Sequence, residues 1–90
     1  MLYTRGMEHI RAQLDQAKRQ ISEIKNARAR RDLDRMYNTV ESILSDISRE
    51  QVICRRLHRE TSLYQNLVKK AEEYMLNLSQ NITFATLIYG

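Results

Sequence analysis

The residues best suited to chemistry are arginines that helical spacing would align. Arg28, Arg31 and Arg35 recur at steps of four and three, which places side chains on one face of an α-helix. Arg55 and Arg59 repeat that spacing later in the chain. A row of this kind could contact phosphates in a salt-dependent way that ignores base sequence. Few aromatic residues lie nearby to stack on bases, and acidic residues are interspersed, so a solvated, ion-paired face is the competing interpretation.

No residues have the spacing of a catalytic or metal site. Cys54 and His58 lie four residues apart, which is half of a zinc ligand set. A cysteine packed in an apolar row, with a histidine at its edge, is the simpler interpretation. The neighbouring carboxylates would point in different directions on a helix, and no glycine-rich loop could hold a phosphate. We therefore predict no enzyme activity, no metal and no cofactor.

The composition of the 90 residues indicates one domain made of long helices. The chain has no proline, and Gly6 and Gly90 are its only glycines, whereas a β-rich fold needs many turn residues. Cys54 is the single cysteine, which excludes an internal disulfide and favours a reducing, intracellular setting. The first residues carry charges and lack the apolar core of a signal peptide. We predict one cytoplasmic, all-α domain spanning residues 1–90.

The net charge of +4 is concentrated at one end of the chain. Residues 1–35 contain nine basic and five acidic residues, whereas residues 36–90 contain six of each. A basic end can attract nucleic acid, anionic lipid or an acidic protein. This surplus is too small to select one of these classes.

Apolar residues recur at helical spacing along most of the chain. The first row is Tyr3, Met7, Ile10, Leu14, Ala17, Ile21 and Ile24. The second row is Leu33, Met36, Val40, Ile43 and Ile47. The third row is Cys54, Leu57, Thr61, Tyr64, Val68, Ala71, Met75, Leu78, Ile82, Ala85 and Tyr89, with Thr61 its one polar member. The alternation of three and four is typical of coiled-coil packing, and the third row predicts one long helix.

The sequence SDISREQV, residues 45–52, carries the signals of a helix start. Ser48 and Gln51 have the spacing of a capping box, and Ile47 and Val52 that of a hydrophobic staple. A turn here predicts an antiparallel hairpin with helices over about 7–46 and 49–88. Each helix would have about 40 residues and be about 60 Å long. One helix running through Ser48 is the competing interpretation, and the change of row at 25–32 leaves open either a kink or a third helix.

The hairpin would bring the two groups of arginines together. Arg35 would then meet Glu60, and Glu41 would come near Arg55. The combined anion or nucleic-acid face would be Arg28, Arg31, Arg35, Arg55 and Arg59.

The segment after Glu73 has no charge as far as Gly90 and is apolar on several sides. A helix of this kind should be buried on more than one side. It is short and contains several polar residues, so we predict no membrane span. The first helix can cover only one side, which leaves the rest for another chain. The predicted protein interface is Tyr74, Met75, Leu78, Ile82, Phe84, Leu87 and Ile88.

These patterns favour a non-enzymatic protein–protein interaction module that completes a helical bundle. Its partner would be a second copy, giving a homodimer, or another helical protein. An adaptor, a small chaperone or a complex subunit would have this character. The alternative is a nucleic-acid-binding helical hairpin dimer that uses the arginine face. Loss of nucleic-acid affinity with rising salt would separate the two functions.

Overall fold

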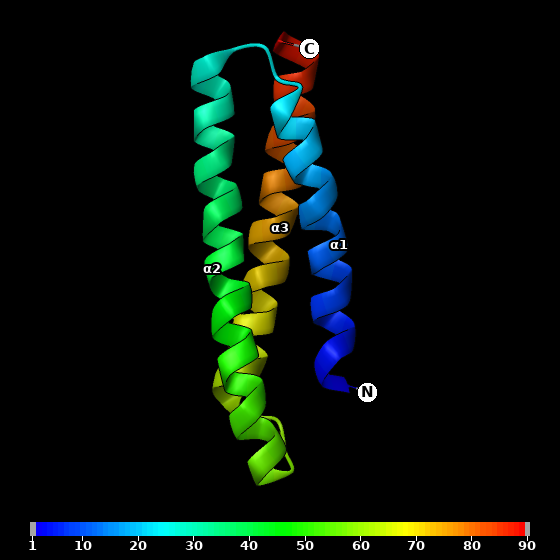
Figure 1. The fold of residues 1–90 in the computed structure, drawn as a ribbon, viewed down its shortest axis with the longest axis vertical. Coiled ribbons are helices and arrows are strands. Elements are labelled where there is room, and N and C mark those ends of the chain that lie inside the picture. Colours follow the sequence, from blue (N-terminus) through cyan, green and yellow to red (C-terminus); the bar gives the residue numbers. More distant parts are fainter. Residues whose placement is uncertain (1, 90) are drawn as a thin grey trace.

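Residues 2–89 form three helices that run up, down and up along one axis (Figure 1). The computed structural model describes the backbone of residues 2–89 and the side chains of residues 7–89. The helices are α1 (Leu2–Ser22), α2 (Ala27–Leu57) and α3 (Ser62–Tyr89). Each contacts the other two, and the bundle measures 48 × 19 × 15 Å. The all-α prediction is confirmed, whereas the division into two helices of about 40 residues is wrong.

Most members of the predicted apolar rows lie in the core of this bundle. From α1 the core receives Ile10, Leu14, Ala17 and Ile21, with Ile24 following in the connecting loop. From α2 and α3 it receives Leu33, Val40, Ile43, Leu44, Ile47, Cys54, Tyr64, Ala71, Met75, Leu78, Ile82 and Ala85. Met36 and Val68 are partly buried against them. Leu57 and Tyr89 of the third row are exposed, however, and the side chain of Tyr3 lies outside the described residues. Most members of the rows are thus buried, although the connections between the helices differ from those predicted.

The first connection, residues 23–26, overlaps the start of the segment 25–32, where the sequence left a kink or a third helix open. Asn26 begins α2, because its side-chain Oδ1 accepts a hydrogen bond of 2.9 Å from the Ala29 N–H. An N-cap of this kind satisfies one of the free amides of a first helical turn. Arg30 then reaches back across the loop and donates to the Ile24 carbonyl at 2.6 Å. The apolar row changes at this point because the chain reverses direction.

The second connection lies between His58 and Thr61. His58 ends α2 with φ 56° and ψ 33°, the left-handed conformation that glycine usually supplies at this position. The Arg59 N–H donates to the Cys54 carbonyl at 3.1 Å, which closes the end of the helix. Thr61 begins α3, since its Oγ1 accepts from the Tyr64 N–H at 3.1 Å. The one polar member of the third row is thus a helix cap.

The predicted turn at Ser48 is wrong, because α2 runs through this region without a break. Ser48 is exposed on α2, and its hydroxyl lies 4.0 Å from the Met7 sulfur. Gln51, the predicted capping-box partner, and its neighbour Glu50 are both buried in the bundle. These two polar residues lie between Ile47 and Cys54, which are both fully buried on the same helix.

Moving the turn also changes which residues face one another. Arg35 does not meet Glu60, because α2 near Arg35 lies beside the C-terminal half of α3. Glu41 instead pairs with Arg11 of α1, at 3.6 Å. Both side chains are about half exposed, so this pair contributes at most about 1 kcal/mol to stability. The predicted hairpin pairs are therefore absent from the described residues.

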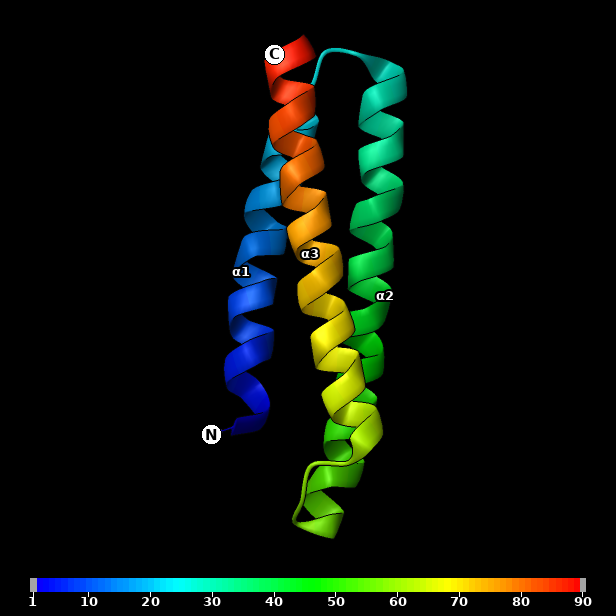
Figure 2. The ribbon, with the colours of Figure 1, turned by 180° about the vertical axis from the view of Figure 1, so that it is seen from behind.

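The helix α1 is shorter than the other two and covers only part of their length. Figure 2 shows α2 and α3 continuing well beyond the N-terminal end of α1 toward the second connection. Apolar side chains are exposed in that extension, namely Val52, Ile53, Leu57 and Leu63. The bundle is thus three helices thick over most of its length and two helices thick at one end.

Candidate functional site: the outer face of α3

The C-terminal half of α3 carries apolar side chains on two sides. One side holds Met75, Leu78 and Ile82, which are 2%, 0% and 3% exposed in the core. These three residues were predicted to lie in an interface with another chain. The structure places them inside the bundle, where they contact the chain's own helices. They are therefore unavailable to a partner while the bundle is folded.

The opposite side of α3 is exposed and apolar, and it holds Phe84, Leu87 and Ile88 of the predicted interface together with Leu76. Leu76, Phe84 and Leu87 are 60%, 63% and 81% exposed, and Ile88 beside them is 55% exposed. Tyr74 is also exposed, and the Lys70 ammonium lies 5.6 Å from the centre of its ring. Large exposed apolar patches are uncommon on monomeric proteins and mark binding surfaces. We call Leu76, Phe84, Leu87 and Ile88 the outer face of α3.

A groove of about 240 Å³ borders this face where α3 lies beside α2. Its α2 wall is formed by Ala29, Asp32, Leu33 and Met36, and its α3 wall by Asn81, Phe84, Ala85, Ile88 and Tyr89. Two residues of the outer face, Phe84 and Ile88, thus also line the groove. The outer face and the groove form one continuous, mainly apolar surface, whose polar members include Asp32, Gln80 and Asn81.

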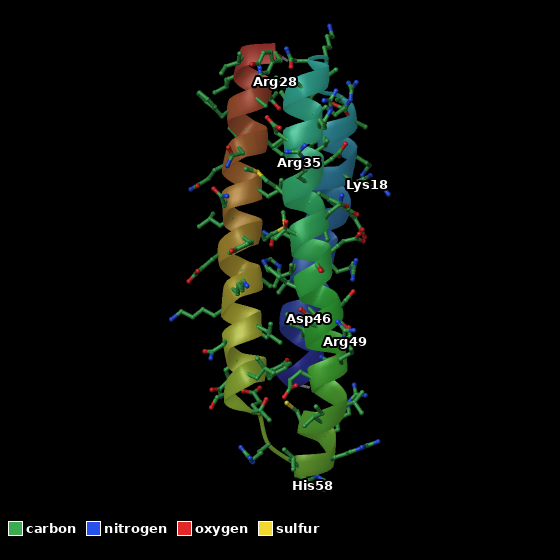
Figure 3. All side chains as sticks on the ribbon, turned by 90° about the vertical axis from the view of Figure 1, so that its left-hand side faces the viewer. Lys18, Arg28, Arg35, Asp46, Arg49 and His58 are labelled. Carbon is green, nitrogen blue, oxygen red and sulfur yellow. The ribbon has the colours of Figure 1, made fainter. Side chains whose placement is uncertain are left out.

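The arginines lie in two separate groups. Arg28, Arg31 and Arg35 are exposed on the part of α2 that borders the groove, and Figure 3 shows Arg28 and Arg35 there. Arg55 lies 20 residues after Arg35 on the same helix, about 30 Å along its axis. Arg59 follows in the second connection, beyond His58. The structure therefore does not bring the predicted arginine face together.

The first arginine group has no acidic partner within the described part of the chain. The ion pairs among residues 7–89 are Arg11 with Glu41 and Arg49 with Asp46. Arg28, Arg31 and Arg35 take part in neither. Their guanidinium groups thus remain available to an external carboxylate or phosphate.

A buried polar network lies near the second connection, and sequence reasoning missed it. Thr61 Oγ1 donates to Glu50 Oε2 at 2.7 Å, while the Cys54 sulfur lies 3.8 Å from the same hydroxyl. A surface hollow of about 250 Å³ adjoins Glu50, lined also by Asp46, Arg49, Leu63 and Leu67. The signal that could have located this network was Thr61 itself, a cap residue within an apolar row. The network joins α2 to the start of α3.

The described residues contain no cluster of three or more side chains that could hold a metal ion. Cys54 is fully buried inside the bundle, whereas His58 is exposed at the end of α2. The two side chains therefore lie in different environments. Among the described residues, no helix is long and apolar enough to span a membrane. The outer face of α3 with its groove is therefore the feature of this surface that best suits binding.

In comparisons with known proteins, no family model matched this chain, and no curated protein and no solved structure matched it significantly.

Proposed function

We propose that this protein is a non-enzymatic interaction module that binds another protein through the outer face of α3. The observation that carries the proposal is the exposure of Leu76, Phe84, Leu87 and Ile88, each more than half accessible to solvent. Burying a large apolar side chain contributes about 1.5–3 kcal/mol. Several such residues on one face can therefore hold a complex together.

The surroundings of the outer face also suit protein binding. No charged residue lies between Tyr74 and Tyr89, and the centres of protein interfaces are depleted of charge. Arg28, Arg31 and Arg35 flank the groove, where they would form a charged rim. An apolar centre with a polar rim is the usual anatomy of a protein interface. Such a module would serve as an adaptor, a small chaperone or a complex subunit, in the cytoplasm.

The test compares two double substitutions that remove exposed apolar side chains at different places. Phe84→Asp with Leu87→Asp alters the outer face, and Ile53→Asp with Leu57→Asp alters a site on α2 where both side chains are about half exposed. Both variants should keep the helicity of the parent, measured by circular dichroism. After affinity purification from the native cell, the first variant should lose the bound protein and the second should retain it. Equal binding by both variants would refute the proposed site.

The unpaired arginines of α2 favour a second candidate function, the binding of nucleic acid. Arg28, Arg31 and Arg35 could contact phosphates, and affinity would then fall steeply as the salt concentration rises. Arg55 and Arg59 lie too far along the molecule to contact the same short segment. A titration with single-stranded and duplex DNA and RNA at low salt tests this function. The absence of binding to all four would remove it.

A further inference from the structure

We infer that the occupant of the outer face is a second copy of this chain, with the two α3 helices antiparallel and crossing at Gln80. This inference rests on the protein-binding function proposed above and names its partner. Gln80 lies four residues from both Leu76 and Phe84, so all three share one side of α3. A two-fold axis at Gln80 would place Leu76 of each copy against Phe84 of the other.

The sequence around Gln80 has the symmetry that such an axis requires. From Met75 to Ala85 the order of apolar and polar residues is the same in both directions. Leu76 corresponds to Phe84, and polar residues occupy both positions that flank Gln80. A two-fold interface brings the same patch of both copies together, so its surface must be complementary to itself. The two Gln80 side chains, each both donor and acceptor, can hydrogen-bond to one another at the axis.

The charges at the margin of the face favour the antiparallel direction. Glu73 is exposed and continues the row of Leu76 and Gln80 by helical spacing. An axis at Gln80 places Glu73 of one copy opposite Leu87 of the other. Arg31 and Arg35 lie at that level, since Asp32 and Met36 line the groove together with Phe84 and Ile88.

Each dimer would thus contain two equivalent carboxylate–guanidinium contacts between the copies. Arg28 lies further along, at the level of Lys69 of the second copy, and adds no attraction. In a parallel arrangement the same side chains would meet themselves, so that Glu73 would face Glu73. The charge pattern therefore supports the antiparallel dimer over the parallel one.

The first experiment measures mass by light scattering and sedimentation equilibrium. The parent should have twice the chain mass of 10.7 kDa, and Phe84→Asp with Leu87→Asp should reduce it to a monomer. Ile53→Asp with Leu57→Asp, the matched control, should remain a dimer. A monomeric parent would overturn the inference. A dimer that survives the Phe84 and Leu87 substitutions would overturn it too.

The second experiment locates the axis by disulfide formation. Gln80→Cys places the new cysteine on the axis, where it should oxidise to a covalent dimer. Leu76→Cys is the control, because in the antiparallel dimer its two copies lie about 12 Å apart along the helix, beyond disulfide reach. The parent supplies a second control, since its Cys54 is buried and should not cross-link. Equal cross-linking at positions 76 and 80 would indicate a parallel dimer and overturn the antiparallel arrangement.

The third experiment exchanges the charges across the dimer. Glu73→Arg should weaken dimerisation by about tenfold, and adding Arg31→Glu with Arg35→Glu in the same chain should restore it. A combined variant weaker than Glu73→Arg alone would overturn the pairing.

If the parent is a monomer, the dimer inference fails. The proposed function still stands if the parent binds a different protein and the variant with Phe84→Asp and Leu87→Asp does not. If the parent is a dimer that these substitutions dissociate, both proposals are supported. The two proposals can therefore fail separately.

Discussion

Replacing Thr61 with alanine tests both the position of the second turn and the buried polar network. The Thr61 hydroxyl accepts from the Tyr64 amide at 3.1 Å, and it donates to Glu50 at 2.7 Å. Alanine would remove both hydrogen bonds without adding volume. The start of α3 would lose its cap, and the nearly buried Glu50 carboxylate would lose its donor.

The size of the effect follows from these two losses. A lost N-cap costs about 1 kcal/mol. A buried acceptor left without a partner costs about 1–3 kcal/mol. We therefore expect Thr61→Ala to lower the free energy of unfolding by about 2–4 kcal/mol. In a domain of this size the melting temperature should fall by about 8 °C or more.

The assay is urea unfolding followed by far-ultraviolet circular dichroism, with two control variants. Thr61→Ser keeps the hydroxyl and should lose much less stability than Thr61→Ala. Ser48→Ala removes a hydroxyl from an exposed position within α2, where alanine is the better helix former. That variant should equal the parent or exceed its stability by up to about 0.5 kcal/mol. A change of under 0.5 kcal/mol in Thr61→Ala would refute the network, and a loss of about 1 kcal/mol in Ser48→Ala would restore the hairpin.

Three further substitutions test other parts of the bundle by the same unfolding assay. Asn26→Ala should cost about 1 kcal/mol through loss of the α2 cap, and no change would mean that this cap does not form. His58→Gly should raise the free energy of unfolding by about 0.5–1 kcal/mol, because glycine adopts the left-handed conformation without strain. A loss of stability would contradict that backbone geometry. Leu78→Ala should lower the free energy of unfolding by about 2–5 kcal/mol, because Leu78 is fully buried in the core. Val52 is about half exposed, so Val52→Ala should change that free energy by no more than about 0.5 kcal/mol. Similar values for the two variants would contradict the assigned core.

The helical class and the buried faces could be predicted because they depend on local periodicity. Ile10, Leu14 and Ile21 follow the three–four spacing, and the structure buries all three. That spacing reports which side of a helix is apolar, whatever the order in which helices are joined. It does not report where a helix ends when the apolar row continues across the turn.

The turns could not be placed because their usual signals were missing or misleading. His58 adopts the left-handed conformation at the end of α2, so no glycine marks that terminus. Ser48 and Gln51 have capping-box spacing, but they lie within α2. Their polar neighbour Glu50 is buried and accepts a hydrogen bond from Thr61, a contact across 11 residues that no local pattern reveals.

The candidate site could be predicted only in part, for the same reason. An uncharged, apolar segment indicated a binding face, and Phe84, Leu87 and Ile88 are indeed exposed. Which side of α3 remained exposed depended on the position of α1, and the side holding Met75 proved to be internal. The separation of Arg35 from Arg55 likewise depended on the turn, because both lie on α2.

The limited reach of α1 implies a gradient of local opening along the bundle. Near the second connection α2 and α3 have mainly one another for support (Figure 1), and Val52, Ile53, Leu57 and Leu63 remain exposed there. Amide hydrogens are protected according to the free energy needed to open the surrounding structure. Exchange with deuterated water should therefore be fastest at the end that contains His58. It should be slowest where Leu14, Leu44 and Leu78 are fully buried, so the middle of α2 and its end at His58 would open on different timescales.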